Sequence, residues 1–378
     1  MVTAYTDGAV TLRSNRLREG GYHEATDMSG MQGVHTGDFV VHGLDILRGS
    51  VGISDSTGAI SSVCVLCEPT AQADPRYFAW VIRAQAFSGF PRALARGVRE
   101  GGADFRRWDT LAELPVPAPP MSVQTAIADY LDTETARIDT LISKKQRMIW
   151  LINQRFTTVV DHLVWGASED VGWSENLPAG WTSQAFSVST TVAEGQVDPR
   201  LEQFRDLPLI APNHIESGTG RILFLESAAG QEAISGKYLC LAGDVIYSKI
   251  RPSLCKVAIA PERCLTSADM YPIRPSKNLT PRFLLYFLLS RRFTDLAVLE
   301  SERVAMPKIN RDALGRVRMP IPPLYVQDEI VSSLDRESSY RHRMAVTLDK
   351  QIVLLQERRQ ALITAAVTGQ LDIPEVAA

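Results

Sequence analysis

The sequence predicts an α+β protein in which two globular domains of mixed β-sheet and helix alternate with two long helices. Two features of the chain lead to this prediction. A proline-rich run followed by a long stretch without proline or glycine occurs twice, beginning after residues 120 and 323. The segments that precede these stretches are broken by glycine and proline into short apolar runs, which is the pattern of strands and turns.

The chain contains an internal duplication. A Pro-Pro pair and the glutamine after it recur 203 residues later, so that Gln124 matches Gln327. An earlier stretch recurs with a spacing of 206 residues, in which Asp38 matches Asp244 and Pro75 matches Pro281. Copies of this length are domain-sized, whereas solenoid repeats run about 20 to 50 residues. Two copies in one chain predict pseudo-two-fold symmetry.

The two long stretches predict helices over residues 122–165 and 325–368, ended by Gly166 and Gly369. Their apolar residues step by three and four, which predicts an antiparallel coiled coil between the two helices. A helix of 44 residues is about 66 Å long, so the pair would be a rigid spacer. We expect Leu354 to be buried in this pair. The other seam positions are Ile127, Leu131, Ile138, Leu141, Met148, Ile152, Phe156, Val159, Leu163, Met344, Leu348, Ile352, Leu355 and Leu362.

These patterns divide the chain into four parts. The expected boundaries are 1–114 for the first globular domain, 115–166 for the first long helix, 167–318 for the second globular domain, and 319–378 for the second long helix and tail. Within the globular domains we expect strands at Asp38–Val41, Asp244–Ile250 and Lys256–Ala260 and helices at Pro75–Ala84 and Pro281–Arg291.

The charge is close to balanced overall but unevenly distributed. The net charge of the 378 residues is -3 with a pI near 6.1, which argues against a protein that coats nucleic acid by charge alone. From Asp244 to Pro320 there are 14 Lys and Arg against 7 Asp and Glu, while from Met1 to Leu114 there are 11 against 13. The second domain therefore has the composition of a polyanion-binding surface. No basic leader, membrane span or membrane partner is predicted, so the expected location is the cytoplasm.

Five cysteines at irregular spacing do not suggest a disulfide framework. Cys64 and Cys67 form one CxxC pair, but a zinc site needs a second pair of ligands. The segment Ser62–Leu66 equally has the pattern of a buried strand. We therefore expect no metal site, with the strand as the favoured interpretation of this pair.

A cationic loop in the second domain supplies candidate DNA contacts. Lys249, Arg251, Ser253 and Lys256 lie between two predicted strands, and such side chains bind phosphates or base edges. The matching loop of the first domain differs in chemistry, because its candidates His42, Arg48 and Ser50 surround an aspartate. The alternative is that these side chains are solvated loop residues without a partner.

Taken together, these residues resemble the specificity subunits of type I restriction-modification systems. The proline-rich runs before Gln124 and Gln327 are typical of that family, and Ala366–Gln370 resembles its C-terminal ending. The segment Gly172–Trp181 resembles the lead into a second recognition domain, and Pro307–Asn310 resembles the lead out of it. Lys308 in this last segment is a further candidate DNA contact. The resemblance covers nearly the whole chain.

The resemblance implies a non-catalytic DNA-reading subunit. It would bind double-stranded DNA at an interrupted two-part site through two target-recognition domains held apart by the paired helices. Two methyltransferase subunits, which bring S-adenosylmethionine, and two restriction subunits, which bring ATP and magnesium, would be its partners. No cofactor is expected on this chain itself.

The chain departs from the family pattern in two places. Val123 and Val326 replace the glutamate that commonly precedes the motif glutamine, which changes the chemistry at the helix start but not the fold. The segment Trp173–Asp206 has no counterpart in the first copy. We therefore expect the first domain to be incomplete at its beginning, with an unpaired strand edge and an exposed core.

Catalytic motifs are not apparent. Lys237 follows Gly236, but Tyr238 occupies the position of the Ser or Thr that a nucleotide-binding loop needs. The sequence beginning at His23 and Glu24 lacks the second histidine of a zinc protease helix. We therefore predict no catalytic residue. The alternatives are a coiled-coil scaffold without sequence-specific DNA reading and an independent DNA-modifying enzyme.

Overall fold

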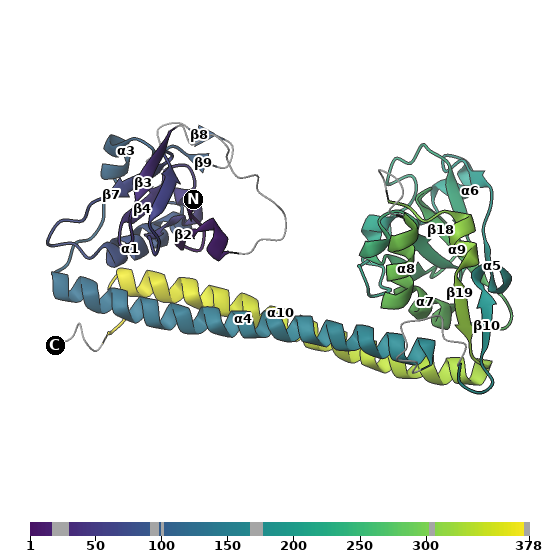
Figure 1. Cartoon of the computed structure of the whole chain (residues 1–378). Coiled ribbons are helices and arrows are strands. Elements are labelled where there is room, and N and C mark those ends of the chain that lie inside the picture. The colour runs from purple at the N-terminus through teal and green to yellow at the C-terminus, as the bar shows by residue number, and fades with distance from the viewer. Residues whose placement is uncertain (17–29, 91–97, 100–101, 167–176, 302–306, 374–378) are drawn as a thin grey trace. The chain divides into compact units, whose positions relative to one another are not determined.

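A computed structural model gives the fold of the chain (Figure 1). It describes all residues except 17–29, 91–97, 100–101, 167–176, 302–306 and 374–378. The described chain forms two compact units. Unit 1 comprises Met1–Gln146 and Asp349–Ala378, and unit 2 comprises Arg147–Leu348, so each long helix contributes one part to each unit.

The long helices are α4, Met121–Trp165, and α10, Leu324–Val367. Both lie within one residue of their predicted bounds, because uninterrupted helix-forming residues extend from the prolines to a glycine. Gly166 and Gly369 end the helices with φ of 74° and 72°, a left-handed conformation that favours glycine. The sequence therefore determines where the helices begin and end.

In unit 1 the first part of α4 packs against the last part of α10. The Lys145 ammonium donates to the Gln351 amide oxygen at 2.6 Å, and Arg359 forms an ion pair with Asp139 at 3.0 Å. The contacting residue moves from 145 to 139 in α4 as it moves from 351 to 359 in α10, which confirms the antiparallel direction within this unit. The apolar contact includes Ile127, Ala128 and Leu131 of α4 with Ile363 and Ala366 of α10.

In unit 2 the last part of α4 contributes to the main core. Phe156, Val160 and Val164 of α4 are buried in one cluster with Ile330 and Leu334 of α10. Arg155 and Glu337 form an ion pair at 3.3 Å beside this cluster.

The predicted seam is wrong at three positions. Leu354 is 63% exposed, Leu141 is 42% exposed and Met148 is 45% exposed. A seven-residue pattern drifts by about 20° per heptad on an ideal helix, so the apolar stripe turns away from its neighbour over a long helix. In the last turns of α10 the buried residue is accordingly Ile363 and not the adjacent Leu362.

Unit 1 combines small antiparallel sheets with the helix α1, Pro75–Ser88. One face of α1 presents Tyr77 and Trp80 to the long helices, and the other presents Ala79 and Ile82 to the sheet core, as Figure 1 shows for α1 beside α4 and α10. The sheets have the orders β5-β4-β7, β3-β6, β1-β2 and β8-β9. The strands are β1 Val2–Ala4, β2 Val10–Leu12, β3 Met31–Val34, β4 Phe39–His42, β5 Val51–Ile53, β6 Gly58–Ser61, β7 Cys64–Cys67, β8 Val98–Arg99 and β9 Gly102–Ala103, and the remaining helices are α3 Trp108–Ala112 and the 3-10 turns η1 Arg13–Asn15 and η2 Ile46–Arg48.

Unit 2 contains two four-stranded sheets, β11-β18-β15-β16 and β12-β14-β17-β13, and the pair β10-β19. Its core is dominated by α7, Pro281–Leu289, in which every residue from Phe283 onward is buried. The strands are β10 Thr182–Ala185, β11 Thr190–Val192, β12 Gln196–Val197, β13 Leu209–Ile210, β14 Lys237–Cys240, β15 Val245–Ser248, β16 Val257–Ile259, β17 Cys264–Thr266, β18 Met270–Pro275 and β19 Arg318–Ile321, and the other helices are α5 Phe186–Ser189, α6 Glu202–Arg205, α8 Arg291–Ser301, α9 Arg311–Arg316 and the 3-10 turns η3 Pro212–His214 and η4 Pro252–Leu254.

The duplication is visible in the topology of the two units. In unit 1 β4 pairs with β5 and β7, and in unit 2 the corresponding β15 pairs with β16 and β18. The helices α1 and α7 also begin at matching prolines. The mixed α+β fold class with long helices predicted from the sequence is therefore confirmed.

A glutamine clamp explains why the motif glutamine follows the prolines. The buried Gln327 amide donates to the carbonyls of Asn278 and Pro322 at 2.8 and 2.9 Å, and its oxygen accepts from the Thr280 N–H at 2.8 Å. Gln124 makes the same three bonds in unit 1, to Gln72, Pro119 and Asp74. Each clamp joins a long helix to the start of α1 or α7.

Unit 1 lacks one strand pairing that unit 2 has. In unit 2 β18 pairs with β11 on the side away from β15, whereas in the described part of unit 1 the equivalent β7 pairs with β4 alone. The expected unpaired edge is thus present. The expected exposed core is not seen there, because Val2 and Val10 of the β1–β2 hairpin are buried with Val34, Val40 and Ile60.

The two cysteines of the CxxC pair lie in a strand of unit 1. Cys64 and Cys67 lie on β7, as the strand interpretation requires, and both are free thiols. None of the helices described is both long and apolar enough to span a membrane.

Candidate nucleic-acid interface

In unit 2 two segments far apart in the sequence form one cationic ribbon. Ile250 forms an antiparallel bridge with Lys308, the Arg251 N–H donates to the Pro307 carbonyl at 3.0 Å, and the Ile309 N–H donates to the Lys249 carbonyl at 3.0 Å. Lys249, Arg251 and Lys308 are thereby brought together by backbone pairing. We call residues 249–251 and 307–309 the cationic ribbon.

The loop that carries Arg251 has an unusual backbone. Arg251 and Cys255 both have positive φ, 46° and 47°, on either side of the 3-10 turn η4. This conformation costs a residue with a Cβ roughly 1 to 2 kcal/mol. Arg251 and Ser253 are both exposed in this loop.

Lys249 and Lys256, the two lysines of the predicted cationic loop, have different surroundings. Lys249 is half-buried, with its ammonium 5.4 Å from the centre of the Tyr271 ring. The Lys256 ammonium instead donates to the Ile215 carbonyl at 2.8 Å in a partly buried position. Lys256 therefore has a structural partner within the domain, whereas Lys308 is exposed beside Arg251.

The candidates of unit 1 surround the turn η2 and are less available. Ser50 is 1% exposed, so its hydroxyl does not reach the surface in this conformation. His42 accepts the Asp45 N–H at its Nδ1 at 3.0 Å, which gives the ring a role within the turn. Arg48 is well exposed and has Asp45 at 3.8 Å as its nearest acidic partner among the described residues.

Sequence reasoning missed an arginine beside the cationic ribbon. Arg311 donates to Glu194 at 3.0 Å and to the Ala193 carbonyl at 2.8 Å, and its guanidinium lies 5.5 Å from the Tyr271 ring centre. Burial raises the pKa of Tyr271, whose hydroxyl donates to the Ile309 carbonyl at 3.3 Å. The Pro307–Asn310 motif directly before Arg311 was the signal in the sequence that could have identified this arginine. Tyr271, whose ring lies beside the guanidinium, is distant from the motif in the sequence.

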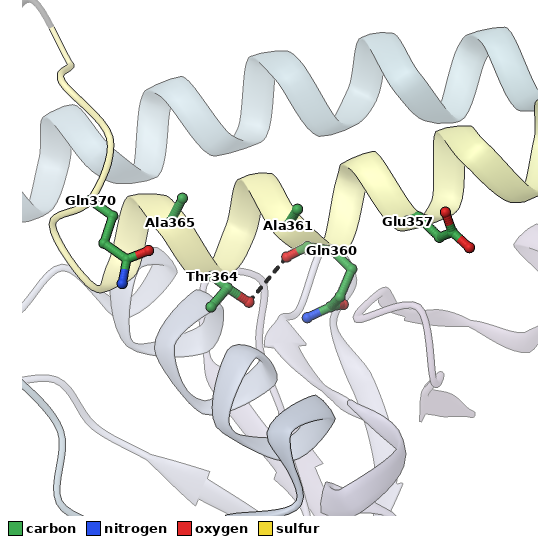
Figure 2. Close-up of a pocket in the computed structure, with 6 residues that line it drawn as sticks. All are labelled: Glu357, Gln360, Ala361, Thr364, Ala365 and Gln370. Atoms are coloured by element: carbon green, nitrogen blue, oxygen red, sulfur yellow. Dashed lines mark hydrogen bonds between the residues drawn. The ribbon is translucent and has the colours of Figure 1, made fainter.

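The described residues line two cavities that differ in size and chemistry. A shallow pocket of about 510 Å³ lies on the last turns of α10 in unit 1. Figure 2 shows its lining side chains, in which the Thr364 hydroxyl donates to the Gln360 carbonyl at 3.1 Å and Glu357 is the sole charged member. A smaller cavity of about 180 Å³ in unit 2 includes Cys255, and burial raises the pKa of its thiol. Among the residues described, no cluster of His, Cys, Asp and Glu has the arrangement of a metal site.

Comparison with known proteins agrees with the geometry. Residues 204–341 match the family described as the type I restriction modification DNA specificity domain. The type I restriction enzyme EcoDI specificity subunit of Escherichia coli is 26% identical over 315 residues, which cover 77% of this chain and 69% of that protein. The StySPI specificity subunit of Salmonella potsdam is 26% identical over 207 residues, which cover 52% of this chain and 44% of that protein.

Solved structures show the same fold. A chain from a study of complex assembly and conformational transition in the type I R-M system has a TM-score of 0.71 at 16% identity, covering 92% of this chain and 85% of that one. The HsdS subunit from Thermoanaerobacter tengcongensis has a TM-score of 0.50 at 16% identity, covering 92% and 84%. The chain is thus similar to type I restriction enzyme specificity subunits, and residues 204–341 match their DNA specificity domain.

Proposed function

We propose that this chain reads an interrupted two-part DNA site, with each unit contacting one part. The observation that carries the proposal is the cationic ribbon of unit 2, which gathers Lys249, Arg251 and Lys308 from segments more than 50 residues apart. Lysine and arginine side chains supply the phosphate and guanine contacts of DNA-binding proteins. The duplicated topology of unit 1 supports a second, chemically different contact surface.

In this proposal the chain supplies recognition, and its partners supply the chemistry. Methyltransferase subunits carry S-adenosylmethionine, and restriction subunits carry ATP and Mg²⁺. The long helices support docking because they expose large apolar side chains to water, where a partner that covered them would stabilise the complex. Trp150 and Leu151 of α4 in unit 2 are each about half exposed, and the Arg147 guanidinium lies 3.9 Å from the Trp150 ring centre.

Reconstitution tests this division of labour. The purified chain is mixed with the methyltransferase subunits of the same genome, and methylated bases are mapped on genomic DNA. We expect methylation at an interrupted site only when chain and methyltransferase are both present. Methyl transfer by the chain alone would show an independent enzyme. Methylation without sequence preference by the full complex would show a scaffold.

Point variants test the ribbon. Removing Arg251 or Lys308 should cost about 1 to 3 kcal/mol and relax one position of one half-site if the side chain reads a base. A phosphate contact would instead weaken binding to all sequences and lower the salt slope by about 0.9. Lys277→Ala is the matched control, because Lys277 is exposed and follows the opposite end of β18. Equal behaviour of all three variants would contradict a DNA contact by the ribbon.

A further inference from the structure

The ribbon has a backbone counterpart in unit 1 at a place that the sequence repeat does not indicate. The Phe105 N–H donates to the Gly43 carbonyl at 2.8 Å, as the Ile309 N–H donates to the Lys249 carbonyl at 3.0 Å in unit 2. Gly43 and Lys249 are matched positions of the duplication, because they lie 206 residues apart in the sequence. Phe105 and Ile309 are both completely buried in the core of their own unit. The segment Asp104–Trp108 therefore occupies the place of the second half of the cationic ribbon.

Unit 1 does not repeat the charges of unit 2 at these matched positions. The three cations of the ribbon in unit 2, Lys249, Arg251 and Lys308, correspond to Gly43, Asp45 and Asp104 in unit 1. A DNA contact by unit 1 must therefore come from other side chains. The segment supplies them directly after Phe105, as Arg106, Arg107 and Trp108.

The acidic residue of this segment is neutralised locally. Arg106 makes a two-pronged ion pair with Asp104, with N···O distances of 2.9 and 2.7 Å. The hydrogen bond from Arg106 lowers the pKa of Asp104 to about 2, so the pair stays ionised and its charges offset each other. The charge that remains available in the segment is that of Arg107.

Arg107 and Trp108 project into solvent next to each other. The Arg107 side chain is exposed and makes no hydrogen bond or ion pair with another described residue, and Trp108 is 60% exposed. Several other described arginines of this unit have acidic partners, such as Arg16 with Asp7 at 2.6 Å. An exposed indole beside a guanidinium matches two needs of a duplex surface, because the cation binds phosphate or guanine and the ring contacts apolar sugar and thymine methyl groups.

We propose that Asp104–Trp108 is the DNA-contacting edge of unit 1, with Arg107 as the cation and Trp108 as the apolar contact. This inference rests on the proposed function, since it assigns the second half of the two-part site. It replaces Ser50 and His42 as principal contacts, because Ser50 is buried and the His42 Nδ1 accepts the Asp45 N–H.

The test uses the full chain assembled with its methyltransferase subunits and duplex DNA that carries the mapped site. Arg107→Ala and Trp108→Ala should each weaken binding about 5- to 150-fold or relax base preference in one half of the site. The affected half must differ from the half that Arg251→Ala relaxes. Arg137→Ala is the matched control, because Arg137 is an exposed arginine of α4 in the same unit. Trp108→Phe, which keeps an exposed ring, should restore most of the loss.

The outcomes separate this inference from the proposed function. Suppose that Arg107→Ala and Trp108→Ala bind like Arg137→Ala while Arg251→Ala still relaxes one half-site. The assignment of Asp104–Trp108 as the DNA-contacting edge is then wrong, whereas the proposal of a two-part DNA site is not contradicted. If the unsubstituted complex shows no sequence preference, both proposals are wrong. Melting temperatures should match the unsubstituted chain for both variants, because neither side chain is buried.

Discussion

The clamp residue Gln327 offers a direct test of how unit 2 is held to its long helix. Gln327 is 0% exposed and makes three hydrogen bonds with backbone groups, at 2.8, 2.8 and 2.9 Å. Replacing it by alanine removes this partner from the partly buried Thr280 N–H and Asn278 carbonyl and from the buried Pro322 carbonyl. Thr280 is the N-cap of α7, so the loss falls at the start of the central helix of the core.

The magnitude follows from the number of bonds. Each net hydrogen bond contributes about 1 kcal/mol, and a buried group left without a partner costs about 1 to 3 kcal/mol. Water that enters the space left by the side chain recovers part of this cost. We therefore expect Gln327→Ala to lower the free energy of unfolding of unit 2 by about 3 to 5 kcal/mol. Gln327→Glu keeps the acceptor but points a carboxylate at two carbonyls, so it should not restore stability.

Hydrogen exchange measures this locally, because a single melting curve mixes two units. A loss of 3 kcal/mol raises the exchange rate of the most protected α7 amides about 150-fold when exchange follows unfolding. Gln154→Ala is the control, because Gln154 is exposed on α4 in the same unit. A Gln327→Ala effect within about 0.5 kcal/mol of that control would refute the clamp.

Three other predictions follow from burial and charge. Leu334→Ala should destabilise unit 2 by about 2 to 5 kcal/mol in urea unfolding, whereas Leu354→Ala, at a position 63% exposed, should change stability by under about 0.5 kcal/mol. Burial raises the pKa of Cys67 to about 11, so its alkylation rate should rise about tenfold per pH unit from pH 7 to 10 and not level off near pH 9. Arg274→Ala should cost about 2 to 4 kcal/mol in thermal unfolding, because the Asp244 carboxylate is buried against that guanidinium at 2.8 Å.

The long helices and the main strands were predictable because their signals are local. Uninterrupted helix-forming residues between prolines and a glycine determined α4 and α10 to within one residue. The faces of these helices were not predictable to the same degree. A stripe of apolar residues indicates that another element covers this face of the helix. Whether Leu354 or Ile352 is covered depends on the neighbouring helix and on how far the stripe has rotated around the helix axis at that point.

The candidate site was predictable only in part, because its assembly depends on pairing over long sequence distances. The bridge between Ile250 and Lys308 cannot be inferred from either segment alone. The counterpart in unit 1 was hidden for another reason. Gly43 and Lys249 differ by 206 residues, but Phe105 and Ile309 differ by 204, so a search at a fixed spacing does not align the segments that follow them.

A 3-10 turn followed by a residue with positive φ recurs in both units, while the side chains around it change. Gly49 and Cys255 are matched residues that both end the 3-10 turn with positive φ, 85° and 47°. Glycine adopts this conformation freely, whereas a cysteine does so at a cost of about 1 to 2 kcal/mol. In unit 2 the cysteine sulfur packs against the carbonyls of Leu288 and Leu289 at 3.6 and 3.8 Å, which helps to hold it there. The residue before the turn changes in both chemistry and conformation, from Asp45 with φ of -109° to Arg251 with φ of 46°. The two units therefore present different side chains at this position, as the proposed reading of two different half-sites needs.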